Sequence, residues 1–201
     1  MSKIDYPIAA LVGFFAGIFA IPTVLNLGLH RPGQLLALPW IAAGLWVFGI
    51  WFGALLGRRM PFLTQFAKFV AVGFLNTAID FGVLNILSRI LGITAGFVIG
   101  GVNIPGFLVA VTNSFFWNKF WVFRDRGKGE PLLHDFPEFL AVTIGGALIN
   151  SGIVIGLTTY VTPLFGLGAG AGLNVAKAAA TAVTLFWNFA GYKFVVFRRS
   201  P

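Results

Sequence analysis

Long stretches with almost no charged residues constrain this sequence more than any other feature. A helix of about 20 predominantly apolar residues is long enough to cross the hydrocarbon core of a bilayer. Stretches of this kind, bounded by charged residues or by Pro and Gly, lie near residues 7–28, 35–57, 66–90, 98–123, 137–161 and 173–197. The sequence therefore predicts an all-α integral membrane protein with about six transmembrane helices.

Composition supports the membrane assignment and removes several classes of function. The 201 residues are 58% hydrophobic and only 10% charged, whereas about 25% of the residues in a soluble domain are charged. The formal net charge of +8 is better explained by basic loops near anionic headgroups than by nucleic acid. Cysteine is absent and there are two histidines, which leaves little basis for a metal site. We expect no cofactor and no nucleic-acid partner.

The basic residues fall unequally on the two sides of the membrane. If the N-terminus is cytoplasmic, the outer side receives only Arg31, Arg89 and Lys177. The cytoplasmic side then receives the other basic residues, which are Lys3, Arg58, Arg59, Lys68, Lys119, Arg124, Arg126, Lys128, Lys193, Arg198 and Arg199. Because Lys and Arg collect in cytoplasmic loops, we expect both termini in the cytoplasm and a multi-pass protein of the cytoplasmic membrane.

An internal repeat organises most of the chain. Residues 69–72 (FVAV) recur as residues 139–142 (FLAV), and residues 119–124 (KFWVFR) recur as residues 193–198 (KFVVFR). Each copy is a pair of membrane helices, so both copies have the same orientation. The sequence therefore predicts two parallel two-helix repeats in residues 62–199.

The first part of the chain lies outside this repeat. We interpret residues 1–60 as an added N-terminal transmembrane helical hairpin and residues 61–201 as a four-helix transmembrane domain. In the hairpin, Gly13-x-x-x-Gly17 and Gly49-x-x-x-Gly53 permit close approach of helices. Such motifs are as consistent with packing within one chain as with self-association.

Polar and small residues form stripes along the predicted membrane helices. In the helix of residues 66–90, the residues with the i, i+3, i+4, i+7 spacing of one face are Gly73, Asn76, Thr77 and Asp80. The equivalent residues of the second copy are Thr143, Gly146, Ala147 and Asn150, and the face of the last helix carries Lys177, Thr181, Thr184 and Asn188. Because lipid offers no hydrogen bonds, we expect these faces to turn toward one another or toward a hydrated cleft.

Asp80 is the most informative residue of these stripes. A charged Asp at the centre of a membrane helix costs about 2.5 to 3.5 kcal/mol on insertion scales, so it needs a partner, a proton or water. We favour the interpretation that Asp80 lines a polar pathway, and the alternative is a neutral Asp hydrogen-bonded between helices. Lys177 lies near the outer end of its helix, where it either serves the pathway or extends to the interface.

The motifs together resemble a known family. Residues 66–81 (FAKFVAVGFLNTAIDF) followed by residues 118–124 (NKFWVFR) are similar to the GtrA-like family of small four-helix membrane proteins. The second copy, from residues 136–139 (FPEF) through residues 192–198 (YKFVVFR), completes the resemblance over residues 62–199. It implies flipping of a polyprenyl-phosphate-linked sugar between the leaflets, for cell-surface polysaccharide, alongside a membrane glycosyltransferase.

The resemblance and the stripes together give a set of candidate residues. Basic helix ends would capture the lipid phosphate, polar side chains including Thr184 would replace water around sugar hydroxyls, and the headgroup would leave near Arg89. The predicted substrate-binding residues are Asn76, Asp80, Asn113, Asn118, Lys119, Arg124, Asn150, Lys177, Asn188, Lys193 and Arg198.

Three functions remain open at this level. The first is the lipid-linked sugar flippase, and the second is a small-solute or drug transporter with Asp80 as a proton-coupled site. The third is a non-transporting subunit that anchors a glycosyltransferase through the basic loop after Arg124. The sequence has no nucleophile beside a convincing base and no paired acids, so we expect no enzyme activity. Four core helices are few for a closed pathway, which favours a homo-oligomer.

Overall fold

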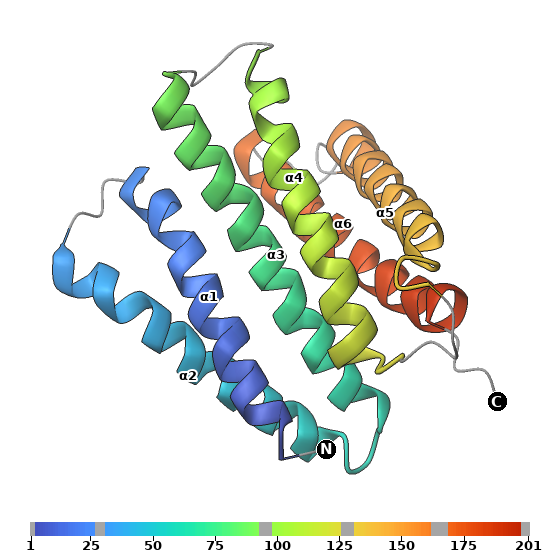
Figure 1. Ribbon diagram of the computed structural model, residues 1–201. Coiled ribbons are helices and arrows are strands. Elements are labelled where there is room, and N and C mark those ends of the chain that lie inside the picture. The colour runs from blue at the N-terminus through green and yellow to red at the C-terminus, as the bar shows by residue number, and fades with distance from the viewer. Residues whose placement is uncertain (1–2, 27–30, 93–97, 126–130, 162–168, 198–201) are drawn as a thin grey trace. The chain divides into compact units, whose positions relative to one another are not determined.

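The computed structural model of the chain describes residues 3–26, 31–92, 98–125, 131–161 and 169–197. For some helical residues within these ranges, including 98–103 and 169–178, only the backbone is described. Every regular element in the described ranges is helical (Figure 1), which confirms the all-α prediction. The elements are α1 (Asp5–Asn26), α2 (Pro32–Leu56), α3 (Phe62–Leu91), α4 (Val98–Trp117), the π-helical turn η1 (Asn118–Val122), α5 (Phe136–Gly156), the π-helical turn η2 (Leu157–Val161), α6 (Ala169–Gly191) and the π-helical turn η4 (Tyr192–Val196).

The chain divides into two compact units, Met1–Arg124 and Asp125–Pro201. The first unit holds α1 to α4 and η1, and the second holds α5, η2, α6 and η4. The hairpin of α1 and α2 therefore shares a compact unit with the first copy of the sequence repeat. The domain boundary that we predicted at residue 60 is based on where the sequence repeat begins, not on which helices pack together. That boundary stays a prediction.

Three helices among the described residues are long and apolar enough to cross a membrane, and they span Asp5–Leu25, Pro32–Leu56 and Phe62–Leu91. Phe136–Asn150 is a shorter apolar helix. On α2, Trp40 and Leu45 leave 70% and 64% of their surface uncovered by the chain, which suits a helix that lies against lipid. The chain is an all-helical, multi-pass membrane protein.

In the first unit, α1 packs against both α2 and α3, and α3 packs against α4 (Figure 1). Gly13 of α1 faces the backbone of α2, where an added Cβ would stand 2.8 Å from Ala43 Cα. Gly17 faces the backbone of Pro39 in the same way. The Gly13-x-x-x-Gly17 motif therefore serves close packing within the chain, as small residues do between membrane helices.

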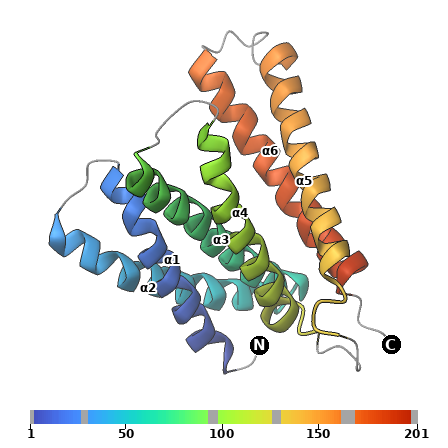
Figure 2. The same ribbon diagram turned by 45° about the horizontal axis from the view of Figure 1, so that its top comes forward.

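The second unit is a pair of helices, α5 and α6, that lie side by side (Figure 2). Its core is aromatic: Phe139 is fully buried and its ring stacks on Tyr192 with a centroid distance of 4.3 Å. The Tyr192 hydroxyl also shares a hydrogen bond of 2.7 Å with Thr143 Oγ1. Gly191 leaves room for the side chain of Val142. These contacts fix the end of α6 against the start of α5.

The same local structure ends α4 and α6. In both cases the α-helix continues into a π-helical turn, closed by Phe123 N–H donating to Asn118 O at 2.9 Å and by Phe197 N–H donating to Tyr192 O at 2.8 Å. The two turns contain the lysine and the apolar residues of the repeated motif, as NKFWV in η1 and YKFVV in η4. π-Helical turns are rare and often mark functional sites, so the repeat of the sequence is also a repeat of an unusual backbone.

Candidate functional site

An amide pair joins α3 to α4 in the first unit. Asn113 Nδ2 donates to Asn76 Oδ1 at 2.7 Å, and Trp117 Nε1 donates to Asn113 Oδ1 at 3.1 Å. Asn113 and Trp117 are one turn apart and so project from the same face of α4. Polar side chains of the two helices therefore meet here.

Asp80 lies one turn beyond Asn76 on the same face of α3. Its Oδ1 is buried and has no hydrogen-bond partner in the part of the chain that the structure describes. Gly106 of α4 faces it, and a Cβ at residue 106 would stand 2.9 Å from that oxygen. A buried acceptor without a partner costs about 1 to 3 kcal/mol. Such an atom is a candidate acceptor for a ligand hydroxyl.

The second unit repeats this pattern with different residues. Asn150 Nδ2 on α5 donates to Thr184 Oγ1 on α6 at 3.3 Å. One turn beyond Thr184, Asn188 Oδ1 is buried and has no partner among the residues described. Gly146 of α5 faces this oxygen. In each unit, a buried acceptor that faces a glycine therefore lies one turn from a polar contact between helices.

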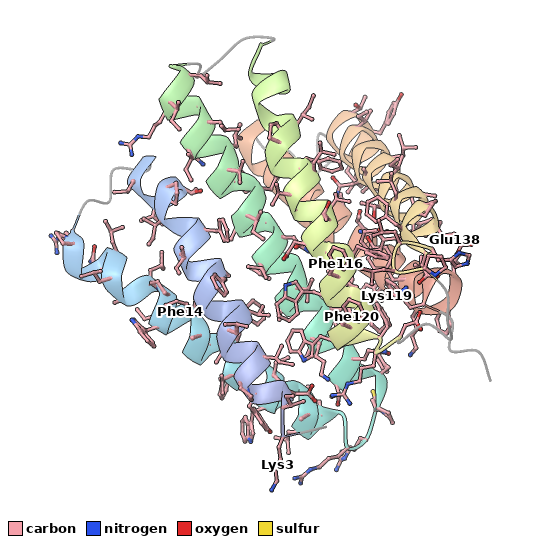
Figure 3. The ribbon with its side chains drawn as sticks, in the orientation of Figure 1. Lys3, Phe14, Phe116, Lys119, Phe120 and Glu138 are labelled. Atoms are coloured by element: carbon pink, nitrogen blue, oxygen red, sulfur yellow. The ribbon has the colours of Figure 1, made fainter. Side chains whose placement is uncertain are left out.

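An open groove of about 400 Å³ lies along α4. Its walls are mostly apolar and its lining residues are Leu108, Val109, Thr112, Asn113 and Phe116. Of these, Phe116 is labelled on α4 in Figure 3. Asn113 belongs both to this groove and to the amide pair. The groove therefore brings an apolar surface up to a polar contact between helices.

A cluster of charged residues lies at the end of the first unit where α1 and α3 begin and α4 ends. Asp5 is fully buried, and its Oδ1 accepts hydrogen bonds from Lys68 Nζ at 2.7 Å and from Arg124 Nη2 at 2.8 Å. Trp121 Nε1 donates to the same oxygen at 3.1 Å. Arg124 was predicted as a ligand of lipid phosphate, and in the structure it binds a carboxylate.

The backbone of Arg124 is in the left-handed region, with φ of 54°. This conformation costs a non-glycine residue about 1 to 2 kcal/mol. Arg124 lies two residues after the π-helical turn η1. With its backbone in this conformation, its guanidinium group contacts the Asp5 carboxylate. Strain of this kind is common where side chains are positioned for function.

The sequence motifs and this geometry agree with one known family. Residues 68–197 match the family described as GtrA/DPMS, transmembrane domain. The chain belongs to this family. The GtrA/DPMS match begins within α3, so the α1–α2 hairpin precedes the family domain.

The GtrA-family chain is also similar to a curated protein. The Bacillus subtilis (strain 168) protein named "Uncharacterized membrane protein YngA" is 30% identical over 132 residues, which cover 65% of this chain and 77% of that protein. No solved structure matches the chain. These similarities confirm the family, and the name of the relative adds that it is a membrane protein.

The lysines of the two GtrA motifs have the same surroundings. Lys119 is buried, and its Nζ lies 5.6 Å from the centroid of the Phe115 ring (Figure 3). Lys193 Nζ lies 5.6 Å from the ring of Phe189, at the equivalent position, and 5.4 Å from the ring of Phe194. A cation over an aromatic face is attracted by the negative face of the ring. Capture of phosphate by these lysines stays a prediction.

The remaining predicted site residues lie apart from these contacts. Asn118 is buried, its Nδ2 donates to Ser114 O at 2.8 Å, and its Oδ1 has no partner within the described ranges. Arg198 and the side chain of Lys177 are outside the residues that the structure describes. Sequence reasoning missed Asp5, although a signal existed, because Asp5 is the only acidic residue before Asp80.

Proposed function

We propose that this chain moves a polyprenyl-phosphate-linked monosaccharide across the cytoplasmic membrane, for the synthesis or modification of cell-surface polysaccharide. The observation that carries the proposal is the pair of buried acceptors, Asp80 Oδ1 and Asn188 Oδ1, which lack partners in the described ranges. A sugar headgroup that crosses hydrocarbon needs acceptors for its hydroxyl groups. Membership of the GtrA/DPMS transmembrane family supports the same conclusion.

The proposal includes a topology. Six helices cross the membrane, the two repeats are parallel, and both termini lie in the cytoplasm, because this arrangement gives the cytoplasmic side most of the lysines and arginines. Lys119, Arg124, Lys193 and Arg198 then end their helices at the cytoplasmic surface, where an anionic lipid headgroup is captured. The polar stripes lie between this surface and the outer residues Arg89 and Lys177, where the headgroup leaves.

The cargo has two parts with opposite solvent preferences. The sugar and phosphate follow polar side chains, whereas the prenyl chain stays in lipid or along an apolar surface. The groove on α4 supports this division, because Leu108, Val109 and Phe116 line it together with Asn113. A homodimer would enclose the pathway, and a membrane glycosyltransferase would supply the lipid-linked sugar.

Two other functions have an observation in their favour. Asp80 is a single carboxyl group on a membrane helix, which suits proton-coupled transport of a small solute. The direct bond between Asn76 and Asn113 suits a static scaffold that anchors a glycosyltransferase. In the flippase both features have a role, since the amide bond positions the helices and the carboxyl oxygen accepts from the cargo.

Flipping in liposomes tests the proposal. The purified chain is reconstituted with a fluorescent polyprenyl-phosphate monosaccharide, and the fraction that becomes accessible in the opposite leaflet is followed with time. We expect Asp80→Ala to lower the rate at least ~10-fold, which corresponds to about 1.4 kcal/mol of lost stabilisation. Phe81→Ala is the matched control, because Phe81 adjoins Asp80 on α3, lies outside the polar stripe and leaves 50% of its surface uncovered by the chain.

Each outcome separates the three functions. Flipping that is equal in wild type, Asp80→Ala and Phe81→Ala would remove Asp80 from the pathway. Wild-type protein that moves no lipid but binds a glycosyltransferase would favour the scaffold. Movement of a proton with a small solute, and of no lipid, would favour the solute transporter.

A further inference from the structure

Three hydrogen-bond donors in the first unit converge on a single carboxylate oxygen. Lys68 Nζ, Arg124 Nη2 and Trp121 Nε1 lie 2.7, 2.8 and 3.1 Å from Asp5 Oδ1. Charged donors of this kind bind carboxylate and phosphate oxygens alike. We propose that Lys68, Trp121 and Arg124 form a binding site for a phosphate group, and that the Asp5 carboxylate holds the place of a phosphate oxygen.

The charge of the site favours phosphate over the carboxylate that occupies it. Lys68 and Arg124 bring two formal positive charges, whereas Asp5 brings one negative charge. A polyprenyl monophosphate, the carrier lipid without its sugar, is a phosphate monoester with nearly two negative charges at neutral pH, so it matches the two cations more closely than the sugar-linked diester, which carries one. Trp121 adds a neutral indole donor. The site therefore selects an anion with several acceptor oxygens and more charge than a single carboxylate.

The position of the site suits the phosphate of a lipid. The side chains of Asp5 and Lys68 are 0% and 6% exposed, whereas that of Arg124 is 43% exposed. A ligand therefore reaches the buried donors past Arg124. Lys68 lies in the second turn of α3, Trp121 lies in η1 and Arg124 follows η1. The proposed topology places these helix ends among the cytoplasmic headgroups. The choice of a lipid phosphate rests on the proposed function.

The site belongs to the first repeat alone. In the second repeat, Glu138 stands at the position of Lys68 and Val195 stands at the position of Trp121. A carboxylate in place of an ammonium group would repel phosphate. The hairpin that carries Asp5 also packs on the first repeat, through α1 and α3. The three donors and the Asp5 carboxylate that they bind therefore occur together in the first unit.

Asp5 is placed where it can leave the site without unfolding the unit. It is the first residue of α1, and the first turn of a helix opens far more easily than its interior. The remainder of α1 stays attached through Gly13 and Gly17, which lie against the α2 backbone. Asp5 therefore acts as an internal competitor, and a phosphate displaces it by opening a single turn.

Binding of a long-chain polyprenyl monophosphate to the full-length protein in nanodiscs tests the inference. We expect Asp5→Asn to bind this lipid about tenfold more tightly than wild type, because an internal competitor that fills nine tenths of the sites weakens apparent affinity by that factor. Adding Arg124→Gln to Asp5→Asn should reverse the gain. Glu138→Gln, at the equivalent position of the second repeat, is the matched control and should leave the affinity unchanged.

Two further probes identify the source of the phosphate. Polyprenol, which lacks the phosphate, should bind equally to wild type and Asp5→Asn. Inorganic phosphate should compete with the lipid only weakly. Strong binding of inorganic phosphate to Asp5→Asn with no preference for the lipid would show a site for free phosphate, and would overturn the lipid assignment.

If the ion cluster has only a structural role, Asp5→Asn should not increase the affinity for the lipid. If Asp5 only holds the hairpin in place, Asp5→Asn would bind the lipid with unchanged or lower affinity, and that result in folded protein would overturn the proposal. If Asp5→Asn does not fold, Trp121→Phe in the otherwise native chain replaces it. This variant removes one neutral donor and should weaken lipid binding several-fold, and unchanged binding would overturn the proposal.

Failure of this inference and failure of the proposed function are distinguishable. Tight phosphate-dependent binding without flipping would leave the site in place and remove the transport function. Flipping that depends on Asp80, with lipid binding that ignores Asp5, Trp121 and Arg124, would keep the function and remove the site.

Discussion

At the scale of single residues, the two units contain the same kind of buried polar position, built from different side chains. Asp80 Oδ1 and Asn188 Oδ1 are buried acceptors without partners in the described ranges, and a glycine on the facing helix leaves room for each. The glycines are as important as the polar groups, because a larger residue would fill the space that a ligand hydroxyl needs. Both positions therefore combine an unmet hydrogen bond with a small facing residue.

Gly106→Ala tests the close contact at Asp80. Its Cβ would stand 2.8 Å from the backbone oxygen of Asp80 and 2.9 Å from Oδ1, so α3 and α4 must separate at a cost of about 1 to 3 kcal/mol. We expect a lower melting temperature in detergent. Gly73→Ala is the control, because an added Cβ meets nothing within 4 Å, and it should keep or raise the melting temperature. Equal melting of both variants would contradict the contact.

Tyr192→Phe tests the polar contact within the aromatic core of the second unit. The change keeps the ring that stacks on Phe139 and removes the hydroxyl that bonds Thr143 Oγ1 at 2.7 Å. We expect a loss of about 0.6 kcal/mol, the average measured for hydrogen bonds between membrane helices, and of no more than about 1.7 kcal/mol, the largest measured value. Tyr160→Phe is the control, because Tyr160 is exposed. Thermal unfolding of both variants checks the prediction, and a larger loss for Tyr160→Phe would refute it.

At the scale of elements, the unusual features are the π-helical turns and the hairpin. The turns η1 and η4 end α4 and α6 at the same place in the repeated motif. The hairpin joins the first repeat by two means, which are the glycine contacts within the membrane helices and the Asp5 cluster at their ends. The hairpin therefore belongs to the same compact unit as the first repeat.

Gly17→Ala tests the packing of the hairpin. A Cβ at this residue would stand 2.8 Å from the backbone nitrogen of Pro39 and 2.9 Å from Leu38 O. Because backbone atoms yield little, we expect a loss of about 1 to 3 kcal/mol in stability. Gly44→Ala on α2 is the control, since its Cβ meets nothing within 4 Å. The melting temperatures of both variants in detergent test this prediction. A Gly17→Ala protein that melts at the same temperature as Gly44→Ala would show that α1 and α2 do not pack through Gly17.

At the scale of the whole molecule, charge and hydropathy determine what is proposed about topology. The chain carries 14 lysines and arginines against 6 acids, and the proposed arrangement places most of the basic residues on one side. Two parallel repeats require that the connections before each repeat lie on that same side. This requirement is a geometric consequence of an even number of crossings per repeat.

Labelling of single cysteines tests this topology directly, because the native chain contains none. Met60→Cys and Leu132→Cys replace exposed residues before the first and second repeats, and Gly33→Cys replaces an exposed residue in the first turn of α2. We expect an impermeant maleimide to label residues 60 and 132 from the cytoplasmic side and residue 33 from outside. Labelling of residues 60 and 132 from opposite sides would contradict parallel repeats.

Local pattern was enough to predict several features of the fold. The apolar stretches predicted membrane helices, and helical spacing predicted that Asn76 and Asp80 share one face of α3. These predictions succeed because hydrocarbon requires every backbone group to be bonded within a helix. Once the chain is helical, the spacing of residues determines which side chains share a face.

What the sequence determined by itself is therefore the family, the helical membrane architecture and the positions of polar groups along each helix. Only the tertiary structure decided which of these groups are satisfied. Asp5 binds Lys68, Trp121 and Arg124, which are 63, 116 and 119 residues away in the chain, whereas helical periodicity relates only residues within a few turns. Whether a polar group is paired or available depends on which helix lies opposite, and that is decided by packing between distant segments.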